Sequence, residues 1–239
     1  MAKLTAIILA AGNSSRMGRP KALLEYRGKC FIENVCAALR LAGVEERIAV
    51  LGADAEAIAS VWKPAGEKVV VNPAPGLGQL SSLRAGIEAA SKESDGFIVC
   101  LADQPTIAPQ TYKDIIAFWC ESKDYIVIPR CLRDKVAGDR SQVTGQNGGK
   151  IILKNTDSAY LPLATNHSTL SFKRGHPIII PAIYRHLCFE GPLTSGLHWV
   201  THHPSVKVLD LTVEDAGVIR DFDTQRDYER LVNFSADPE

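Results

Sequence analysis

The sequence predicts one three-layer α/β/α domain, spanning residues 1–239, built on a mainly parallel sheet. Short, continuously apolar runs alternate along the chain with segments whose apolar residues recur at helical spacing. Continuous apolarity is typical of strands that are covered on both faces. The composition, 46% hydrophobic and 23% charged over 239 residues, suits a single large domain with a sizeable core.

The expected elements follow in chain order. Leu4–Ala10 has the length and composition of a buried strand, and Phe31–Ala42 has apolar residues at helical spacing up to Gly43. Further strands are expected at 48–51, 69–71, 97–101, 125–129, 178–180 and 206–209. Further helices are expected at 79–91, 109–121, 181–188, 195–202 and 224–233. Open parallel sheets bind ligands at the carboxyl ends of their strands, so we expect the functional residues there.

Charge and composition exclude several classes of protein. Lys plus Arg and Asp plus Glu both number 27, and this zero net charge argues against a dedicated nucleic-acid binder. No apolar run approaches the roughly 20 residues of a membrane span, and the apolar stretch after Met1 ends too soon for a signal peptide. The six cysteines show no Cys-x-x-Cys spacing. We therefore expect a cytoplasmic protein with reduced thiols, without disulfides or structural zinc.

One stretch, at about residues 131–174, interrupts the alternation of strands and helices and is expected to be an insertion. Its seven Lys or Arg and three Asp give a net charge of 7 − 3 = +4. Asn147-Gly148, just before an apolar run, is typical of a hairpin turn. The positive charge would suit an anionic ligand or an acidic partner, but a solvated insertion is the simpler explanation and the one that we favour.

The strongest chemical signal follows the first expected strand: Leu9-Ala-Ala-Gly-Asn-Ser-Ser-Arg-Met-Gly-Arg-Pro-Lys21. Its small residues allow a ligand to approach the backbone, and its N–H groups are suited to cradle phosphate oxygens. Arg16 adds a planar guanidinium that can donate two parallel hydrogen bonds, and Lys21 adds a compact ammonium charge. The segment matches neither the Walker loop nor the Gly-x-Gly-x-x-Gly fingerprint. The alternative explanation is an ordinary turn with two solvated cations.

Two further segments carry polar residues at the ends of expected strands. Gly76-Leu-Gly-Gln-Leu-Ser-Ser82 follows the strand at 69–71 and begins a helix, which a plain turn with a capping serine would also explain. Asp103 follows the very apolar strand at 97–101. A carboxylate in that position is either a cap or a functional group at the ligand-binding edge.

Other polar residues have simpler explanations. His198 and His202 are spaced for one helix face, but Trp199 stands where the zinc motif needs Glu, which favours a surface or packed helix end. Asp54 suits a helix N-cap better than a ribose contact, because the first turn lacks the dinucleotide fingerprint. Asp227 falls in the first turn of the last helix, where the helix dipole stabilises a carboxylate.

Taken together, these segments resemble a known family. The first loop is similar to the Leu-Ala-Ala-Gly-x-Ser-x-Arg-Met-Gly-x-Pro-Lys signature of nucleotidyltransferases, among them molybdenum-cofactor nucleotidyltransferases and sugar-nucleotide pyrophosphorylases. The resemblance continues at matching intervals in Asn72-Pro73 with 76–83, Leu101–Pro105, Gly175-His-Pro177 and Asp221-Phe-Asp-Thr224. This set looks most like the molybdenum cofactor cytidylyltransferases. Only the stretch at 131–174 departs from them, since typical relatives reach Gly-His-Pro much sooner.

The resemblance implies a Rossmann-like nucleotidyltransferase fold and assigns roles to the matching residues. Lys21, Arg16 and Asp103 would be catalytic. Asp103 and Asp223 would bind Mg²⁺ or Mn²⁺, with Asp221 an alternative ligand, a capping residue or a solvated loop residue. The nucleotide would be bound by Leu9, Ala10, Ala11, Gly12, Arg16, Lys21, Asn72, Gly78, Ser82 and Asp103.

The implied reaction is transfer of CMP from CTP to the terminal phosphate of molybdopterin, with release of pyrophosphate. Gly175 and His176 would contact this second substrate, although a turn histidine is an equal explanation. Ala11 stands where guanylyl-transferring relatives have Gly, and its methyl group leaves less room beside the base, which favours CTP over GTP. A recipient molybdoenzyme is an expected partner; nucleic acid and membranes are not.

Three other functions remain open from the sequence. A nucleotidyltransferase that used GTP, or acted on a sugar or alcohol phosphate, would share the triphosphate site and differ in its substrates. A non-catalytic carrier or insertion factor for the molybdenum cofactor would bind pterin but release no pyrophosphate. An NAD-dependent oxidoreductase is disfavoured, because the first loop lacks the fingerprint of dinucleotide-binding folds.

Overall fold

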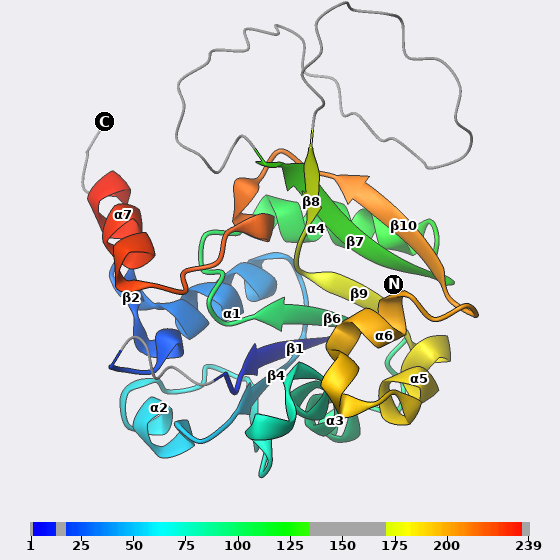
Figure 1. Cartoon of the computed structure of the whole chain (residues 1–239), viewed down its shortest axis with the longest axis horizontal. Helices are drawn as coiled ribbons and strands as arrows, with labels where there is room; N and C mark the ends of the chain where they lie inside the picture. The colour runs from blue at the N-terminus through cyan, green and yellow to red at the C-terminus, as the bar shows by residue number, and fades with distance from the viewer. Residues whose placement is uncertain (1, 13–17, 134–170, 236–239) are drawn as a thin grey trace, which may run out of the picture.

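The computed structural model describes residues 2–12, 18–133 and 171–235. In this part of the chain seven strands of one sheet lie in the order β10-β7-β9-β6-β1-β4-β5, and an eighth, β8, pairs with β7 (Figure 1). The strands are β1 (Leu4–Ala10), β4 (Glu46–Leu51), β5 (Lys68–Val71), β6 (Gly96–Leu101), β7 (Tyr125–Leu132), β8 (Phe172–Arg174), β9 (Ile178–Pro181) and β10 (Lys207–Thr212).

The sheet is mainly parallel, as predicted, with one strand reversed inside it. β1 pairs in parallel with β4 and β6, β4 with β5, and β7 with β10. β9 runs antiparallel to both of its neighbours, β6 and β7. Its first residue, Ile178, pairs with Val99 near the end of β6. The segment before β9 therefore reaches the sheet edge at which β1 and β6 end.

Helices cover both faces of the sheet and make the three predicted layers (Figure 1). The helices are α1 (Phe31–Leu41), α2 (Ala55–Val61), α3 (Gln79–Ala89), α4 (Pro109–Cys120), α5 (Arg185–Glu190), α6 (Gly196–Thr201) and α7 (Gln225–Ser235). Short 3-10 turns are η1 (Lys21–Leu23), η2 (Pro75–Leu77), η4 (Ala182–Tyr184), η5 (Leu193–Ser195) and η6 (Ala216–Ile219), and β2 (Glu25–Tyr26) pairs with β3 (Lys29–Cys30) in a small hairpin.

The central strand β1 joins two hydrophobic cores. Ala6 and Ile8 point into the core under α1 and α4, whereas Ile7 and Leu9 point into the core under α3, α5 and α6. All four are buried, because successive side chains of a strand face opposite sides of the sheet. Full burial of a large aliphatic side chain contributes roughly 1.5–3 kcal/mol, so β1 is firmly placed in the sheet.

A smaller cluster places the last helix beside the first loop. Leu231 of α7 packs with Phe222, Phe31 and Leu24. Thr224 and Asp227 close the N-terminal end of α7, since the Thr224 hydroxyl and N–H both donate to Asp227 and the Asp227 N–H donates back to Thr224 Oγ1. The prediction for Asp227 is confirmed. The segment that precedes α7 is thereby held near η1.

Several expected details are different in the structure. Asp54 occupies the N-cap position of α2, but its side chain makes no capping hydrogen bond there. At the two ends of the expected insertion, Cys131 and Leu132 belong to β7 and Phe172–Arg174 form β8. The hairpin turn expected at Asn147-Gly148 lies outside the described residues. Among the helices that are described, none has both the length and the apolarity to cross a membrane.

Candidate functional site

The cation that ends the first loop lies between two carboxylates. Lys21 opens η1, and its Nζ lies 3.6 Å from Oδ2 of Asp103 and also contacts Oδ1 of Asp223. Asp103 comes just after β6, and Asp223 comes just before α7. Three segments far apart in the sequence therefore place their charged groups together at the carboxyl ends of β1 and β6. Arg16, the other expected cation, lies outside the described residues.

Burial and mutual repulsion act on these acids. Burial raises the pKa of the Asp103 carboxyl, the Lys21 ammonium lowers it, and the charges of Asp221 and Asp223 raise it, with a net result above the ordinary value. Burial lowers the pKa of Lys21, but its contacts with Asp223 and Asp103 raise it above the ordinary value. The cluster thus holds more negative charge than one ammonium neutralises.

Asp103 and Asp223 fit a divalent cation. The two carboxylates already share one cation, the Lys21 ammonium, and Mg²⁺ is bound in proteins by one or two carboxylates together with phosphate oxygens and water. Within the described ranges no group of three or more His, Cys, Asp or Glu is arranged to hold a metal. A metal at this edge would therefore take most of its ligands from substrate and solvent.

Asp221, considered as a second ligand or a solvated residue, makes contacts of its own. Its Oδ1 accepts a hydrogen bond from Gln104 Nε2 at 3.0 Å, and its Oδ2 lies 3.3 Å from Lys173 Nζ. Asp221 is exposed, as expected of a loop residue, but its carboxylate also has these two partners. Lys173 Nζ also donates to the carbonyl of Ile219 at 3.2 Å, so one ammonium connects β8 to the segment before α7.

The loop between β5 and α3 is held by internal hydrogen bonds. Asn72 Nδ2 donates to the hydroxyls of Ser81 and Ser82 at 2.8 and 3.0 Å, and Asn72 Oδ1 accepts from the N–H of Ala74 at 2.9 Å. Asn72 and Ser82 are both buried. These two expected nucleotide-binding residues use their side chains to shape the loop. Gly78 is exposed, with a φ of 96° that favours glycine.

The start of the first loop packs on the end of β4. A Cβ added at Gly52 would lie 2.8 Å from the carbonyl oxygen of Ala11 and 2.9 Å from its Cα. Real Cβ atoms do not approach so closely, so the glycine at position 52 is required for the present path of the loop. Leu9 is buried, Ala10 and Ala11 are half-buried and Gly12 is exposed, so the loop becomes accessible as it leaves the sheet.

Gly175 and His176 lie beside η6. The His176 N–H donates to the Val218 carbonyl at 2.9 Å, and a Cβ at Gly175 would lie only 1.8 Å from the same oxygen. His176 Nε2 is buried without a hydrogen-bond partner in the described part of the chain. Burial lowers the pKa of His176 to about 4, against the opposing charge of Asp221, so the imidazole is neutral at pH 7.

His198 and His202 lie on and directly after α6. Their rings stack with 3.8 Å between centroids, and His202 Nδ1 lies 3.0 Å from the His198 carbonyl oxygen. The pair therefore packs against itself at the end of the helix.

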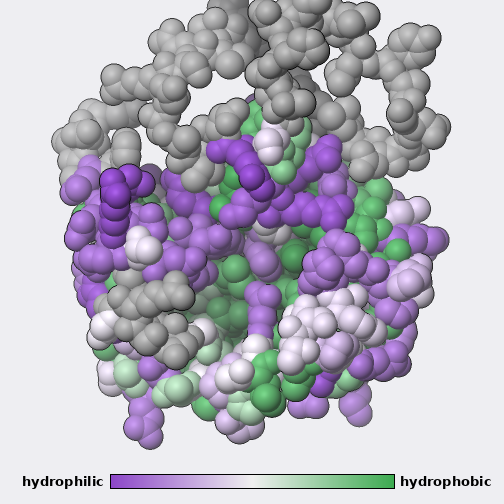
Figure 2. Space-filling view, in the orientation of Figure 1, coloured by the Kyte–Doolittle hydropathy of each residue, from purple (hydrophilic) through white to green (hydrophobic). Residues whose placement is uncertain are grey.

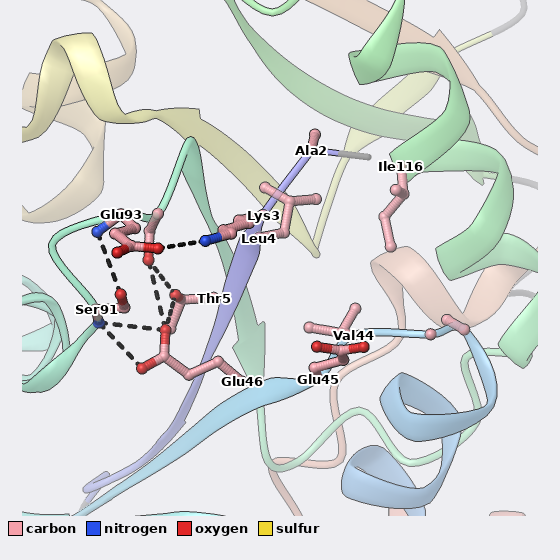
Figure 3. Close-up of a pocket in the computed structure, with 13 residues that line it drawn as sticks. Ala2, Lys3, Leu4, Thr5, Val44, Glu45, Glu46, Ser91, Glu93 and Ile116 are labelled. Carbon is pink, nitrogen blue, oxygen red and sulfur yellow. Dashed lines mark hydrogen bonds and ion pairs between the residues drawn. The ribbon is translucent and has the colours of Figure 1, made fainter.

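A hollow of about 570 Å³ lies at the amino ends of β1 and β4 (Figure 3). Its polar groups are paired with one another: Glu46 accepts hydrogen bonds from the Thr5 and Ser94 hydroxyls and from the Ser91 N–H. This self-contained network offers a ligand few unsatisfied groups. On another face, Figure 2 shows a central hollow with hydrophobic residues inside it and mainly hydrophilic residues around it.

Comparison with known proteins gives a family match over most of the chain. Residues 6–198 match the MobA-like NTP transferase domain. Nicotine blue oxidoreductase from Paenarthrobacter nicotinovorans is 38% identical over 109 residues, which is 45% of this chain and 53% of that protein. A probable molybdenum cofactor guanylyltransferase from Rhodopirellula baltica is 34% identical over 129 residues, 52% of this chain and 60% of that protein. The chain thus spans little more than half the length of these relatives.

Solved structures with the same fold align with nearly all of the chain. Rv0371c from Mycobacterium tuberculosis matches with a TM-score of 0.72 at 24% identity, over 97% of this chain and 98% of that one. Its complex with manganese matches with a TM-score of 0.68 at 23% identity, over 97% and 99%. At this level of identity the likeness establishes the predicted nucleotidyltransferase-type α/β fold.

Proposed function

The chain belongs to the MobA-like NTP transferase domain family, and we propose that it transfers a nucleoside monophosphate from a nucleoside triphosphate to the terminal phosphate of the molybdenum cofactor. The observation that supports this most is the cluster of Lys21, Asp103 and Asp223 at the carboxyl edge of the sheet. Both reactants are anionic, so catalysis depends on neutralising and aligning them. One cation and two metal-binding acids serve that purpose.

In the proposed reaction an oxygen of the acceptor phosphate attacks the α-phosphorus, and the bond from that phosphorus to the bridging oxygen breaks. Pyrophosphate leaves with the electron pair of the broken bond, and no covalent intermediate with the protein is needed. Asp103 and Asp223 would hold Mg²⁺ or Mn²⁺, which when bound supplies positive charge to phosphate oxygens. Lys21 would exchange its carboxylate partners for the triphosphate, and Arg16 would add a second cation.

The loops on the β1, β4 and β5 side of the sheet would bind the nucleotide. Gly52 lets the backbone at Ala11 lie against the end of β4, and the Ala11 methyl group supports CTP as the donor. GTP is the competing donor, because the relative from Rhodopirellula baltica is named a guanylyltransferase. A molybdoenzyme that receives the modified cofactor is the partner that we propose.

The test is pyrophosphate release from a panel of the four nucleoside triphosphates, each with molybdopterin, a sugar phosphate or no acceptor, with and without Mg²⁺ or Mn²⁺. We expect release only with molybdopterin and metal, and faster release from CTP than from GTP. Preference for GTP would reverse the base assignment alone. A parallel assay of NADH and NADPH oxidation is included, because one relative is named an oxidoreductase. Oxidation of either without pyrophosphate release would reject the proposal.

A further inference from the structure

The amide of Gln104 has only one possible orientation. Its Nε2 donates to Asp221 Oδ1 at 3.0 Å and lies 3.4 Å from the Val218 carbonyl oxygen. Both partners are acceptors, so the NH₂ end must face them and Oε1 must face away. Gln104 is only 2% exposed, and no donor in the described residues reaches Oε1. A buried carbonyl oxygen is thus held in place without a partner.

Two more polar atoms near η6 are buried and have no hydrogen-bond partner among the residues that the structure describes. They are Thr106 Oγ1 and His176 Nε2. His176 is bound through its N–H to the carbonyl of Val218, and Thr106 Oγ1 would lie 3.0 Å from a Cβ at the adjoining Gly217. Native structures leave few buried polar atoms unpaired, and a group of them calls for a ligand or ordered water.

These three polar atoms, which belong to Gln104, Thr106 and His176, lie on the far side of Asp103 from the loops assigned to the nucleotide. The nucleotide loops follow β1 and β5, whereas His176 precedes β9 and η6 lies against β7 and β8. β6, which leads to Asp103 and Gln104, separates the two halves in the strand order. If the triphosphate lies on the β1 side, the acceptor substrate must lie on the β9 side for the two to meet at Asp103.

The Lys173–Asp221 ion pair lies at the solvent-exposed end of this group of residues and is able to open. The Lys173–Asp221 ion pair has side chains 45% and 39% exposed, and an exposed ion pair contributes little stability. A ligand that displaced the Lys173 ammonium would find the Asp221 carboxylate next to Gln104. The carboxylate is an acceptor, and Oε1 is the acceptor on the opposite side of the Gln104 amide, so a ligand that reached both would have to present an N–H donor to each.

We propose that Gln104 determines specificity for the acceptor, with Oε1 and the Asp221 carboxylate receiving hydrogen bonds from the amino group and ring N–H of a 2-amino-4-oxopyrimidine edge. A pterin carries this edge, and so does guanine, but the position on the β9 side favours the pterin of the acceptor. Asp221 also acts as a positioning residue, since it fixes the orientation of the Gln104 amide. This inference rests on the proposed function for its choice of pterin.

The test is fluorescence titration of the protein with 6-hydroxymethylpterin and with 6-hydroxymethyllumazine, which has a carbonyl in place of the 2-amino group. We expect the wild type to bind the pterin at least tenfold more tightly than the lumazine. In Gln104→Leu the two should bind alike. Gln110→Leu is the matched control, because Gln110 makes a similar hydrogen bond to Asp114 on the exposed side of α4 at 3.0 Å; this variant should keep the tenfold preference. Gln104→Met, with its melting temperature measured, guards against loss of folding.

Equal binding of the two compounds by the wild type, or the same preference in Gln104→Leu, would overturn the proposal and leave ordered water as the partner of Oε1. Guanosine, which carries the same edge, is titrated in parallel. If the affinity for guanosine depends on Gln104 and the affinity for the pterin does not, the proposal is overturned and Gln104 binds the nucleotide base instead. These titrations need no turnover. Their failure beside active pyrophosphate release would remove only this inference, and success without pyrophosphate release would remove only the transferase function.

Discussion

Lys21 Nζ lies 3.6 Å from Oδ2 of Asp103, so that the cation of the first loop faces the acid that follows β6. The contact joins two parallel strands, β1 and β6, at their carboxyl ends. Asp223 reaches the same ammonium from the segment before α7. This meeting of three segments is the basis of the proposed chemistry.

Loss of either partner in that contact should nearly abolish activity. Lys21→Ala and Asp103→Ala each remove a group proposed to act on charge in the transition state, and such losses typically cost about 10²–10³ in rate. Pyrophosphate release from CTP or GTP with molybdopterin measures the effect. Lys3→Ala is the control, because the exposed Lys3–Glu93 ion pair lies at the opposite edge of the sheet. Wild-type turnover in either site variant would remove the assignment.

His176 should make stability fall as the pH drops below neutral. Burial lowers its pKa from 6.5 to about 4 in the folded chain. Between these two values the unfolded state takes up a proton that the folded state does not, so the free energy of unfolding decreases as the pH falls. Urea unfolding of wild type and His176→Gln between pH 7 and pH 4 should show a steeper decline in the wild type. Parallel declines, or an NMR titration of His176 near pH 6.5, would disprove this.

An alanine at position 52 should disturb the first loop more than the fold. Its Cβ would come within 2.8 Å of the Ala11 carbonyl oxygen, and the half-buried Ala11 has more room to shift than the buried end of β4. We expect nucleotide affinity, measured by calorimetry, to fall about tenfold. A displaced loop would lose a proposed hydrogen bond from a backbone N–H to a phosphate oxygen, and losing a hydrogen bond to a charged group costs roughly 1.5–3 kcal/mol. The melting temperature should change little. An unchanged affinity would show that the loop path does not matter for binding.

Residues 134–170 should be dispensable for nucleotide binding. β7 and β8 are already paired at the base of this segment, with Leu132 opposite Phe172 and the Arg133 N–H donating to the Ser171 carbonyl at 2.9 Å. Replacing the segment with a short Gly-Ser linker therefore keeps the sheet, and it keeps Lys173 as the partner of Asp221. Calorimetric titration with CTP should give an affinity within about twofold of the wild type. Collapse of affinity in a folded variant would place this segment in the nucleotide site.

Periodicity predicted most of the regular elements, because the central strands bury apolar residues on both faces and the longer helices bury one apolar face. It missed the hairpin of β2 and β3, whose two-residue strands are too short to show a period. It gave no range for α2, in which Ile58 is the one residue described as buried, although Asp54 was expected to cap a helix there. β9 was expected as a strand, but its reversed direction follows from pairing with β6 and β7 and cannot be read from its own sequence.

The candidate site was predictable where a motif carries it and not where tertiary contacts create it. Lys21 and Asp103 stand in recognisable segments at strand ends. The buried Oε1 of Gln104, which no donor in the described residues reaches, could not be predicted from the sequence. Its position depends on Asp221, which lies in a distant segment and fixes the orientation of the Gln104 amide. Asn72 and Ser82 were expected to contact the nucleotide, and their internal hydrogen bonds appear only once α3 packs against the end of β5.

The most direct test of the central claim is the single-turnover rate of pyrophosphate release from CTP and GTP, with molybdopterin and Mg²⁺ or Mn²⁺, in Asp103→Asn and Asp223→Asn beside the wild type. These substitutions keep the side-chain size and remove the charges that face Lys21. The account predicts rapid release by the wild type and a loss of at least about 100-fold in each variant. Release at the wild-type rate by both variants would contradict it.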